Sequence, residues 1–174
     1  SVVVGVVLTL PISSAAICAA VGISGSAVLA GVLDGSISMG VWNGLALAGG
    51  AATVGCCCNM LGFAVISYPD NGVGGLVAQG LGTSMLQVPN LMRKPVLWIP
   101  PVLTSAILGP VSTCIFQLRN NGAAISSGMG TAGLVGPIGI ITGWSNMPKG
   151  YAVGAFDWLG MILVCFVLPV LLSW

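Results

Sequence analysis

The segment GLGTSMLQVP at residues 80–89 recurs as GMGTAGLVGP at residues 128–137, and this repeat decides how the chain folds. Both copies fit the pattern G-x-G-T-x-x-L-x-x-P. The shared positions are Gly80, Gly82, Thr83, Leu86 and Pro89 in the first copy and Gly128, Gly130, Thr131, Leu134 and Pro137 in the second. Glycine and proline interrupt helices. Interrupted apolar segments in matching positions of two halves point to the binding site of a transporter.

The composition of the chain is that of an integral membrane protein. Of its 174 residues, 56% are hydrophobic and 4% are charged, and the mean hydropathy is +1.09. Soluble domains carry about 25% charged residues, so this chain could not cover a water-facing surface. A net charge of +1 gives no basic patch for nucleic acid. The chain has no Glu and no His, which leaves few groups for acid–base catalysis.

Apolar runs of sufficient length predict transmembrane helices, because each crossing needs about 20 apolar residues. The runs are 1–23 with a kink at Pro11, 41–66, 96–118 and 152–173. Pro100, Pro101 and Pro110 argue against an unbroken third helix, although the first two could sit in its first turn.

Two further stretches, 71–90 and 120–146, are apolar but rich in Gly, Asn, Gln, Ser and Thr. Non-helical backbone at membrane depth is tolerated only where protein buries it or where it lines a watery cavity. We therefore expect both stretches to form re-entrant hairpins or broken helices beside an internal pathway. The alternative is close helix packing through the glycines. The predicted fold is an all-α polytopic membrane protein with about four to six transmembrane helices, forming one membrane domain over 1–174.

The side chains that could meet a substrate in these stretches are neutral hydrogen-bonding groups, accompanied by glycines that permit close backbone approach. The predicted substrate-binding residues are Gln79, Gly80, Gly82, Thr83, Gln87, Asn90, Gly128, Gly130 and Thr131. A cavity lined in this way suits a neutral polyhydroxylated solute better than an ion or a carboxylate. We predict no catalytic residue, metal site or cofactor.

Other motifs have simpler interpretations. GMGTAG at 128–133 matches a dinucleotide fingerprint literally, but the strand, the uninterrupted helix and the spaced acidic residue that such a site needs are missing. Cys56–Cys58 cannot close one metal site on a helix, because consecutive side chains point about 100° apart; we expect packing. Asp157 is interpreted as an interfacial residue at a helix N-terminus, with a functional intramembrane carboxylate as the alternative.

Polar and aromatic residues near the expected span ends predict turns and an interfacial belt. Asp70-Asn71-Gly72 and Asn120-Asn121-Gly122 are turn signals. The five tryptophans suggest an aromatic belt; they are Trp42, Trp98, Trp144, Trp158 and Trp174. The positive-inside rule would place the loop at 67–95 in the cytoplasm if 123–143 crosses the membrane. It does not decide the orientation if that stretch is re-entrant.

Several segments resemble the membrane IIC component (EIIC) of the bacterial phosphotransferase system. They are VGCCCNMLGFAVISYPDNG (54–72), NGVGGLVAQGLGTSMLQVPN (71–90), WIPPVLTSAILGP (98–110) and SGMGTAGLVGPIG (127–139). The resemblance covers roughly 54–145. It is to the type 2, perfringolysin-regulator-like branch of sugar-specific permeases and membrane-bound toxin-gene regulators. Family members are about twice as long, and the chain opens at Ser1 within an apolar run, so we expect a portion of a longer protein.

The resemblance implies a multi-pass sugar permease of the bacterial inner membrane, usually a homodimer, whose sugar is phosphorylated by a cytoplasmic IIB partner. In other EIIC branches a Glu and a His near re-entrant hairpins handle the sugar hydroxyl. This chain has neither residue type, so that role is not transferred, and any phosphorylation depends on the IIB protein and on groups absent from this chain. The alternatives are a membrane-embedded regulator of the same family and an ion-coupled carrier. The carrier is disfavoured because Asp70 is the one carboxylate near either stretch.

Overall fold

The computed structural model describes residues 34–35, 38–145, 147 and 152–174. The predicted helix at 1–23, with its kink at Pro11, lies outside these residues. Within them, the chain forms helices and turns, in agreement with the all-α membrane fold predicted from the sequence.

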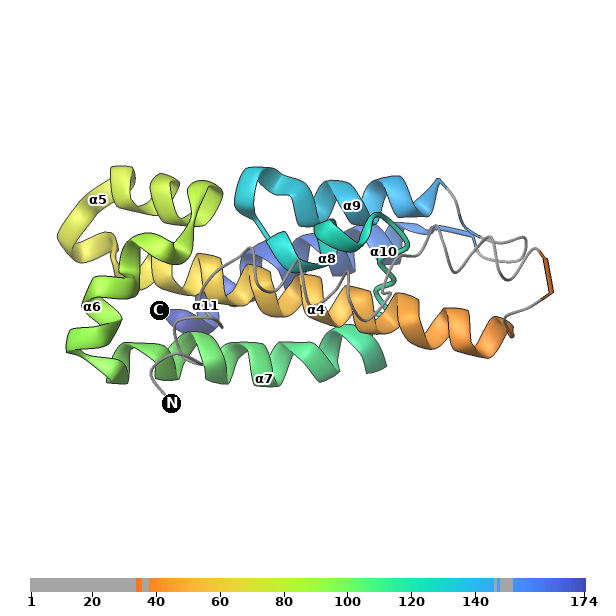
Figure 1. Cartoon of the computed structure of the whole chain (residues 1–174), viewed down its shortest axis with the longest axis horizontal. Coiled ribbons are helices and arrows are strands. Elements are labelled where there is room, and N and C mark those ends of the chain that lie inside the picture. Colours follow the sequence, from red (N-terminus) through yellow and green to blue (C-terminus); the bar gives the residue numbers. More distant parts are fainter. Residues whose placement is uncertain (1–33, 36–37, 146, 148–151) are drawn as a thin grey trace.

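The longest helix, α4 (Met39–Ile66), runs the length of the molecule and contacts most other elements (Figure 1). Ser38 caps its start by accepting a hydrogen bond from the backbone N–H of Val41 at 3.4 Å. A helix of 28 residues is about 42 Å long, which exceeds the roughly 30 Å hydrocarbon core of a bilayer. It matches the run predicted at 41–66.

The second long apolar helix is formed by a 3₁₀ turn, η3 (Pro95–Trp98), that leads into α7 (Ile99–Cys114). It lies beside α4 and runs in the opposite direction (Figure 1). Pro100 and Pro101 occupy the first turn, where no backbone donor is needed. The expectation of a broken helix was wrong at Pro110, which lies inside continuous α7. The helix also ends at Cys114, earlier than the predicted 118, because the following residues form an extended segment.

The third long apolar helix consists of α10 (Ala155–Ile162), the π turn η5 (Leu163–Val167) and α11 (Leu168–Ser173). A proline ring clashes with the carbonyl four residues earlier, and the wider turn before Pro169 relieves that contact. Three helices in the described part of the chain are therefore long and apolar enough to cross a membrane: 39–66, 95–114 and 155–173.

The two Gly-rich stretches form broken helical hairpins. Hairpin A comprises α5 (Tyr68–Val77), the π turn η1 (Ala78–Gly82), the 3₁₀ turn η2 (Ser84–Gln87) and α6 (Val88–Arg93). Hairpin B comprises α8 (Ala124–Met129), the 3₁₀ turn η4 (Ala132–Leu134) and α9 (Val135–Trp144). They enter from opposite ends of α4, and their tips meet beside its middle (Figure 1). The predicted interruption of both stretches is confirmed.

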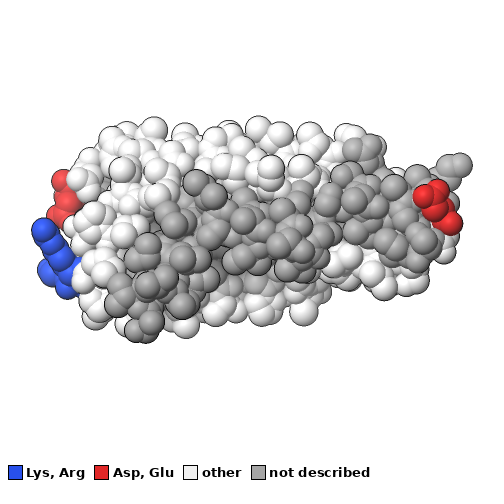
Figure 2. All heavy atoms as spheres, viewed as in Figure 1, with Lys and Arg blue, Asp and Glu red and all other residues white. Residues whose placement is uncertain are grey.

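Charged side chains lie at the two ends of the molecule. On the face shown in Figure 2, basic and acidic groups lie together at one end and an acidic group lies at the other, with no charged side chain among the described atoms visible between them. Arg93 and Lys94 follow hairpin A, whereas Arg119 lies at the opposite end, where its Nε donates to Asn43 Oδ1 at 2.6 Å. Because hairpin B folds back, the positive-inside rule does not decide the orientation.

Candidate functional site

The tips of the two hairpins are built by the repeated G-x-G-T motif. In hairpin A, η1 ends at Gly82, and Thr83 is extended (φ −151°, ψ 137°), with its Oγ1 accepting from the backbone N–H of Met85 at 3.2 Å. In hairpin B, α8 ends at Gly130 (φ 52°, ψ −128°). The turn η1 contacts both η4 and α4, and α8, which leads to the tip of hairpin B, also packs against α4. Each motif therefore reverses the chain at depth, and the two reversals adjoin.

The tip of hairpin B is pressed against the backbone of α4. A Cβ atom on Gly130 would lie 2.7 Å from the carbonyl carbon of Cys56. A Cβ on Gly136 would lie 2.5 Å from the carbonyl oxygen of Gly130. Side chains do not tolerate such distances, and the positive φ of Gly130 also favours glycine. In addition, Cys56 Sγ donates to the carbonyl oxygen of Gly128 at 3.5 Å.

A buried polar network joins the start of hairpin B to α4. Asn120 Nδ2 donates to Thr53 Oγ1 at 2.8 Å and to Ser126 Oγ at 3.3 Å, and Asn120 Oδ1 accepts from the backbone N–H of Gly122 at 3.0 Å. The backbone N–H of Asn120 donates to the carbonyl of Ala46 at 3.0 Å. These bonds satisfy the polar backbone of a buried extended segment, as membrane depth requires.

This network adds to one sequence interpretation and corrects another. Asn120 and Asn121, identified as a turn signal, lie in the segment between α7 and α8, and both are buried and hold hairpin B in place. Trp42 was assigned to an interfacial belt, yet it is fully buried and its Nε1 donates to Asn121 Oδ1 at 3.2 Å. The partners are separated by 67 and 79 residues along the chain, so local sequence patterns carry no signal for them.

A cavity of about 410 Å³ lies between the arms of hairpin A. Its polar lining consists of four carboxamide side chains, two of which, Gln79 and Gln87, are buried. The lining residues are Asn71, Gly74, Gly75, Ala78, Gln79, Leu86, Gln87 and Asn90. The volume falls within the roughly 300–1,000 Å³ typical of small-molecule sites. We call this the amide cavity.

The carboxamide groups of this cavity differ in how well they are satisfied. Gln87 is buried, and its Oε1 accepts from Asn90 Nδ2 at 2.9 Å. Gln79 is 4% exposed, and its Oε1 has no hydrogen-bond partner among the residues that the structure describes. Thr131 Oγ1, at the tip of hairpin B, is likewise buried without a partner there. A buried acceptor left unpaired costs about 1–3 kcal/mol, so Gln79 is suited to receive a ligand hydroxyl.

The nine residues predicted to bind substrate occupy two places. Gln79, Gln87 and Asn90 line the amide cavity, together with Asn71, which the sequence interpretation assigned to a turn. The other six, located at the hairpin tips and outside this lining, are Gly80, Gly82, Thr83, Gly128, Gly130 and Thr131. The clustering of four Asn and Gln residues within one hairpin was the signal that could have identified Asn71.

The glycines at the tips serve different purposes. A Cβ on Gly80 would lie 3.4 Å from the side chain of Leu61, an ordinary contact distance, so the packing around Gly80 does not require a glycine. A Cβ on Gly82 would meet no atom within 4 Å in the described part of the structure. The close backbone approach that we expected of this motif is present at Gly130 alone among these three.

Three remaining predictions concern the cysteine run, Asp157 and two of the tryptophans. Cys57 and Cys58 pack with Cys165 in the main hydrophobic core, as the packing interpretation expected. Asp157 stands in the first turn of α10, where its Oδ2 accepts from the backbone N–H of Gly154 at 2.8 Å. This is the predicted stabilisation of a helix N-terminus. The rings of Trp144 and Trp158 meet edge to face at 4.9 Å.

The whole chain, residues 1–174, matches a family model described as "Phosphotransferase system, EIIC". No curated protein and no solved structure matches the chain.

Proposed function

Because this chain belongs to the EIIC family of the phosphotransferase system, we propose that it is a permease which passes a neutral polyhydroxylated solute through the amide cavity. Membership makes it a membrane component of a sugar-transporting system that works with a cytoplasmic IIB partner. The solute class, the route and the residues are our inference. We further propose a homodimer in the bacterial inner membrane, following the usual assembly of the family.

The observation that carries the proposal is the lining of the amide cavity. Sugar hydroxyls both donate and accept hydrogen bonds, and carboxamides offer two donors and one acceptor each. No ionisable side chain lines this cavity among the described residues, which favours a neutral ligand. Gln79 Oε1 supplies a dehydrated acceptor that gains a partner only when a donor enters the site.

The position of the hairpins supports passage as well as binding. The two tips are short turns rather than membrane-long helices, and they meet beside the middle of α4. Discontinuous helices of this kind surround substrate sites in other transporters.

Substitution of Gln79 by Leu tests the site. A screen of sugars by thermal shift on the detergent-purified protein first identifies a binder, because a bound ligand raises the melting temperature. Gln79→Leu should weaken that binder about tenfold or more, since a ligand hydroxyl loses its partner. The melting temperature of the ligand-free variant should stay equal or rise, because an unpaired buried acceptor has been removed.

Asn59→Leu is the matched control. Asn59 lies on α4, donates to the carbonyl of its own-helix Gly55 at 2.9 Å, and is absent from the cavity lining. It should leave ligand affinity unchanged. Equal affinity of the Gln79→Leu and wild-type proteins would remove the amide cavity as the solute site.

Uptake measurements separate the permease from its alternatives. Proteoliposomes should take up the radiolabelled binder faster than protein-free liposomes, and the Gln79→Leu protein should take it up more slowly than the wild type at concentrations below saturation. Binding without uptake, with or without the phosphotransfer proteins, would favour the membrane regulator. Sodium-dependent flux that disappears in Asp157→Asn would favour the ion-coupled carrier, although Asp157 is already engaged in capping α10.

A further inference from the structure

A second cavity, of about 330 Å³, opens at the end of the molecule where hairpin A joins α4 and η3. It is lined by Phe63, Ile66, Ser67, Asp70, Asn71, Gln87, Asn90, Leu91, Arg93, Lys94 and Leu97. Asn71, Gln87 and Asn90 also line the amide cavity, so the two spaces share one wall. We call the second space the basic mouth.

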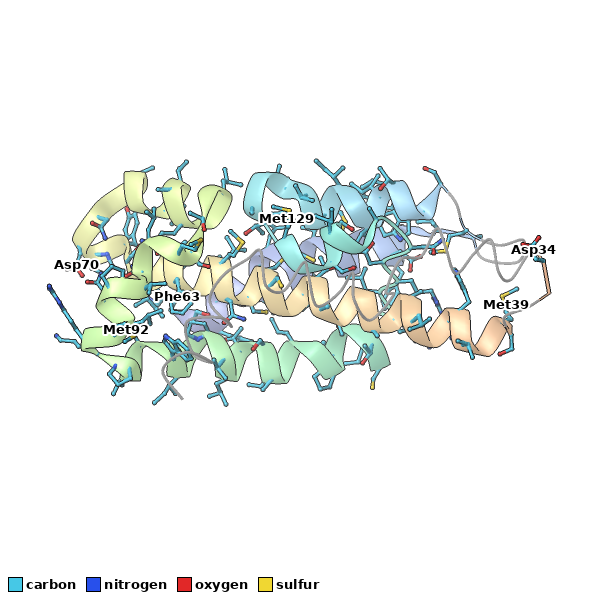
Figure 3. All side chains as sticks on the ribbon, in the orientation of Figure 1. Asp34, Met39, Phe63, Asp70, Met92 and Met129 are labelled. Atoms are coloured by element: carbon cyan, nitrogen blue, oxygen red, sulfur yellow. The ribbon has the colours of Figure 1, made fainter. Side chains whose placement is uncertain are left out.

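The charges at the basic mouth are available for a ligand. Arg93 and Lys94 are exposed there, and Asp70 lies on the opposite arm of hairpin A. None of these three side chains forms an ion pair or hydrogen bond with the part of the chain that the structure describes. Figure 3 places Asp70 at the outer end of hairpin A, near Met92. The mouth therefore carries a net charge of +1 from two cations and one carboxylate.

Basic residues at the end of a membrane helix commonly reach to the interface, which suits both Arg93 and Lys94. Arg93 is also in the last turn of α6, where a positive charge interacts favourably with the helix dipole. Because Lys94 lies beside it on the wall of the same cavity, the two cations can act on one anionic ligand.

We propose that the basic mouth binds the phosphoryl group of a phosphate monoester, and that this end of the protein faces the cytoplasm. This rests on the proposed function, because a solute held by the carboxamides could present a phosphorylated hydroxyl to the mouth next door. A phosphate monoester carries about −1.5 to −2 charge at pH 7 and three acceptor oxygens. Arg93 can bind two of those oxygens with its planar fork, and Lys94 supplies a point charge.

The orientation follows from the partner. The family works with a cytoplasmic IIB protein, and phosphoryl groups are therefore handled on that side. A mouth that accepts them must open there. This places the ends of hairpin A in the cytoplasm, which the positive-inside count could not decide.

Lipid headgroups offer the same phosphate chemistry and must be distinguished. A glycerophospholipid diester presents two terminal oxygens and one negative charge, whereas a phosphate monoester presents three terminal oxygens and up to two charges, so the monoester can engage both Arg93 and Lys94. The two sources separate when the lipid is held neutral. In nanodiscs of phosphatidylcholine alone, soluble phosphate competes with no anionic lipid.

The test is titration of inorganic phosphate into the protein in phosphatidylcholine nanodiscs, followed by calorimetry. The wild type should bind, and the double variant Arg93→Gln with Lys94→Gln should bind more than about tenfold more weakly, since charge-assisted hydrogen bonds are lost. Asp70→Asn should tighten binding roughly threefold, the effect of one unit charge at about 7 Å in water. Arg119→Gln, at the other end, should bind like the wild type.

The outcomes separate this inference from the proposed function. The phosphate titration needs no sugar, so it can succeed if the amide cavity fails as a solute site. Absence of phosphate binding, or binding unchanged in the double variant, overturns the inference. Stabilisation by phosphatidylglycerol nanodiscs through Arg93 and Lys94, with no response to soluble phosphate, would show a lipid contact and also overturn it. The variants at Arg93, Lys94 and Asp70 should match the wild type in size-exclusion elution volume and melting temperature, which would exclude misfolding.

Discussion

At the residue scale, Gly130 and Gly82 occupy equivalent motif positions but unequal surroundings. The second copy of the motif is pressed onto α4, while the first copy leaves open space around its glycine. The equivalent glycine of the repeat is therefore tightly packed in hairpin B but not in hairpin A.

Alanine substitutions at these two glycines should show that difference. Gly130→Ala combines a positive φ with a clash against the Cys56 backbone and should destabilise the protein by about 3 kcal/mol or more. Gly82→Ala should change stability by less than about 1 kcal/mol, because its added methyl meets open space. Melting temperatures in one detergent compare them directly. Similar losses for both variants would contradict the placement of the hairpin B tip.

At the scale of elements, hairpin B depends on Asn120. Asn120→Ala removes three side-chain hydrogen bonds and leaves Thr53 and Gly122 without that partner, so it should cost about 3 kcal/mol. Hydrogen exchange should rise over 118–126. Asn59→Ala, which loses one bond to its own helix, serves as the control and should stay within about 0.5 kcal/mol. Unchanged exchange in the Asn120 variant would show that the network does not hold the hairpin.

The sequence predicted the elements better than their attachments, for a physical reason. Gly130 and Pro137 impose their backbone preferences locally, so the interruptions of both hairpins could be inferred from the repeat. The bonds of Asn120 and Trp42 depend on residues far along the chain, so no local pattern predicts them, and Trp42 was wrongly assigned to an interfacial belt. Pro110 led to the opposite error: we expected it to break the helix, but α7 continues through it.

The candidate site was predicted in part. Gln79, Gln87 and Asn90 share a cavity because one hairpin brings its arms together, which local pattern can suggest. We expected both copies of the repeat to line one chamber, but the residues of hairpin B lie outside the amide cavity lining. Which side chains converge across hairpins depends on the direction of each tip, and that direction is set by packing against α4.

At the scale of the whole molecule, the two ends of the helical bundle should lie on opposite sides of the membrane. Figure 3 shows Met92 and Met39 at opposite ends, with Met129 between them. The side chains of Met92 and Met39 are exposed, at 58% and 45% respectively. A cysteine at Met92 should therefore react with an impermeant thiol reagent from the opposite side to a cysteine at Met39.

Labelling of intact cells and of inverted membrane vesicles measures this. With the orientation inferred from the basic mouth, Met92→Cys should be labelled only in inverted vesicles and Met39→Cys only in cells. The unsubstituted protein gives the background from the native cysteines. Labelling of both from one side would contradict the single crossing that α4 makes between the two positions, and reversed labelling would contradict the orientation alone.

The contact between the hairpin B tip and α4 has a consequence for how the two copies of the repeat can diverge. Gly130 lies directly against the backbone of α4, with no room for a side chain, so the tip of hairpin B should tolerate almost no substitution. Hairpin A borders two cavities and can exchange side chains without disturbing its support. We therefore expect changes in solute preference to arise from substitutions in hairpin A, while the tip of hairpin B stays unchanged.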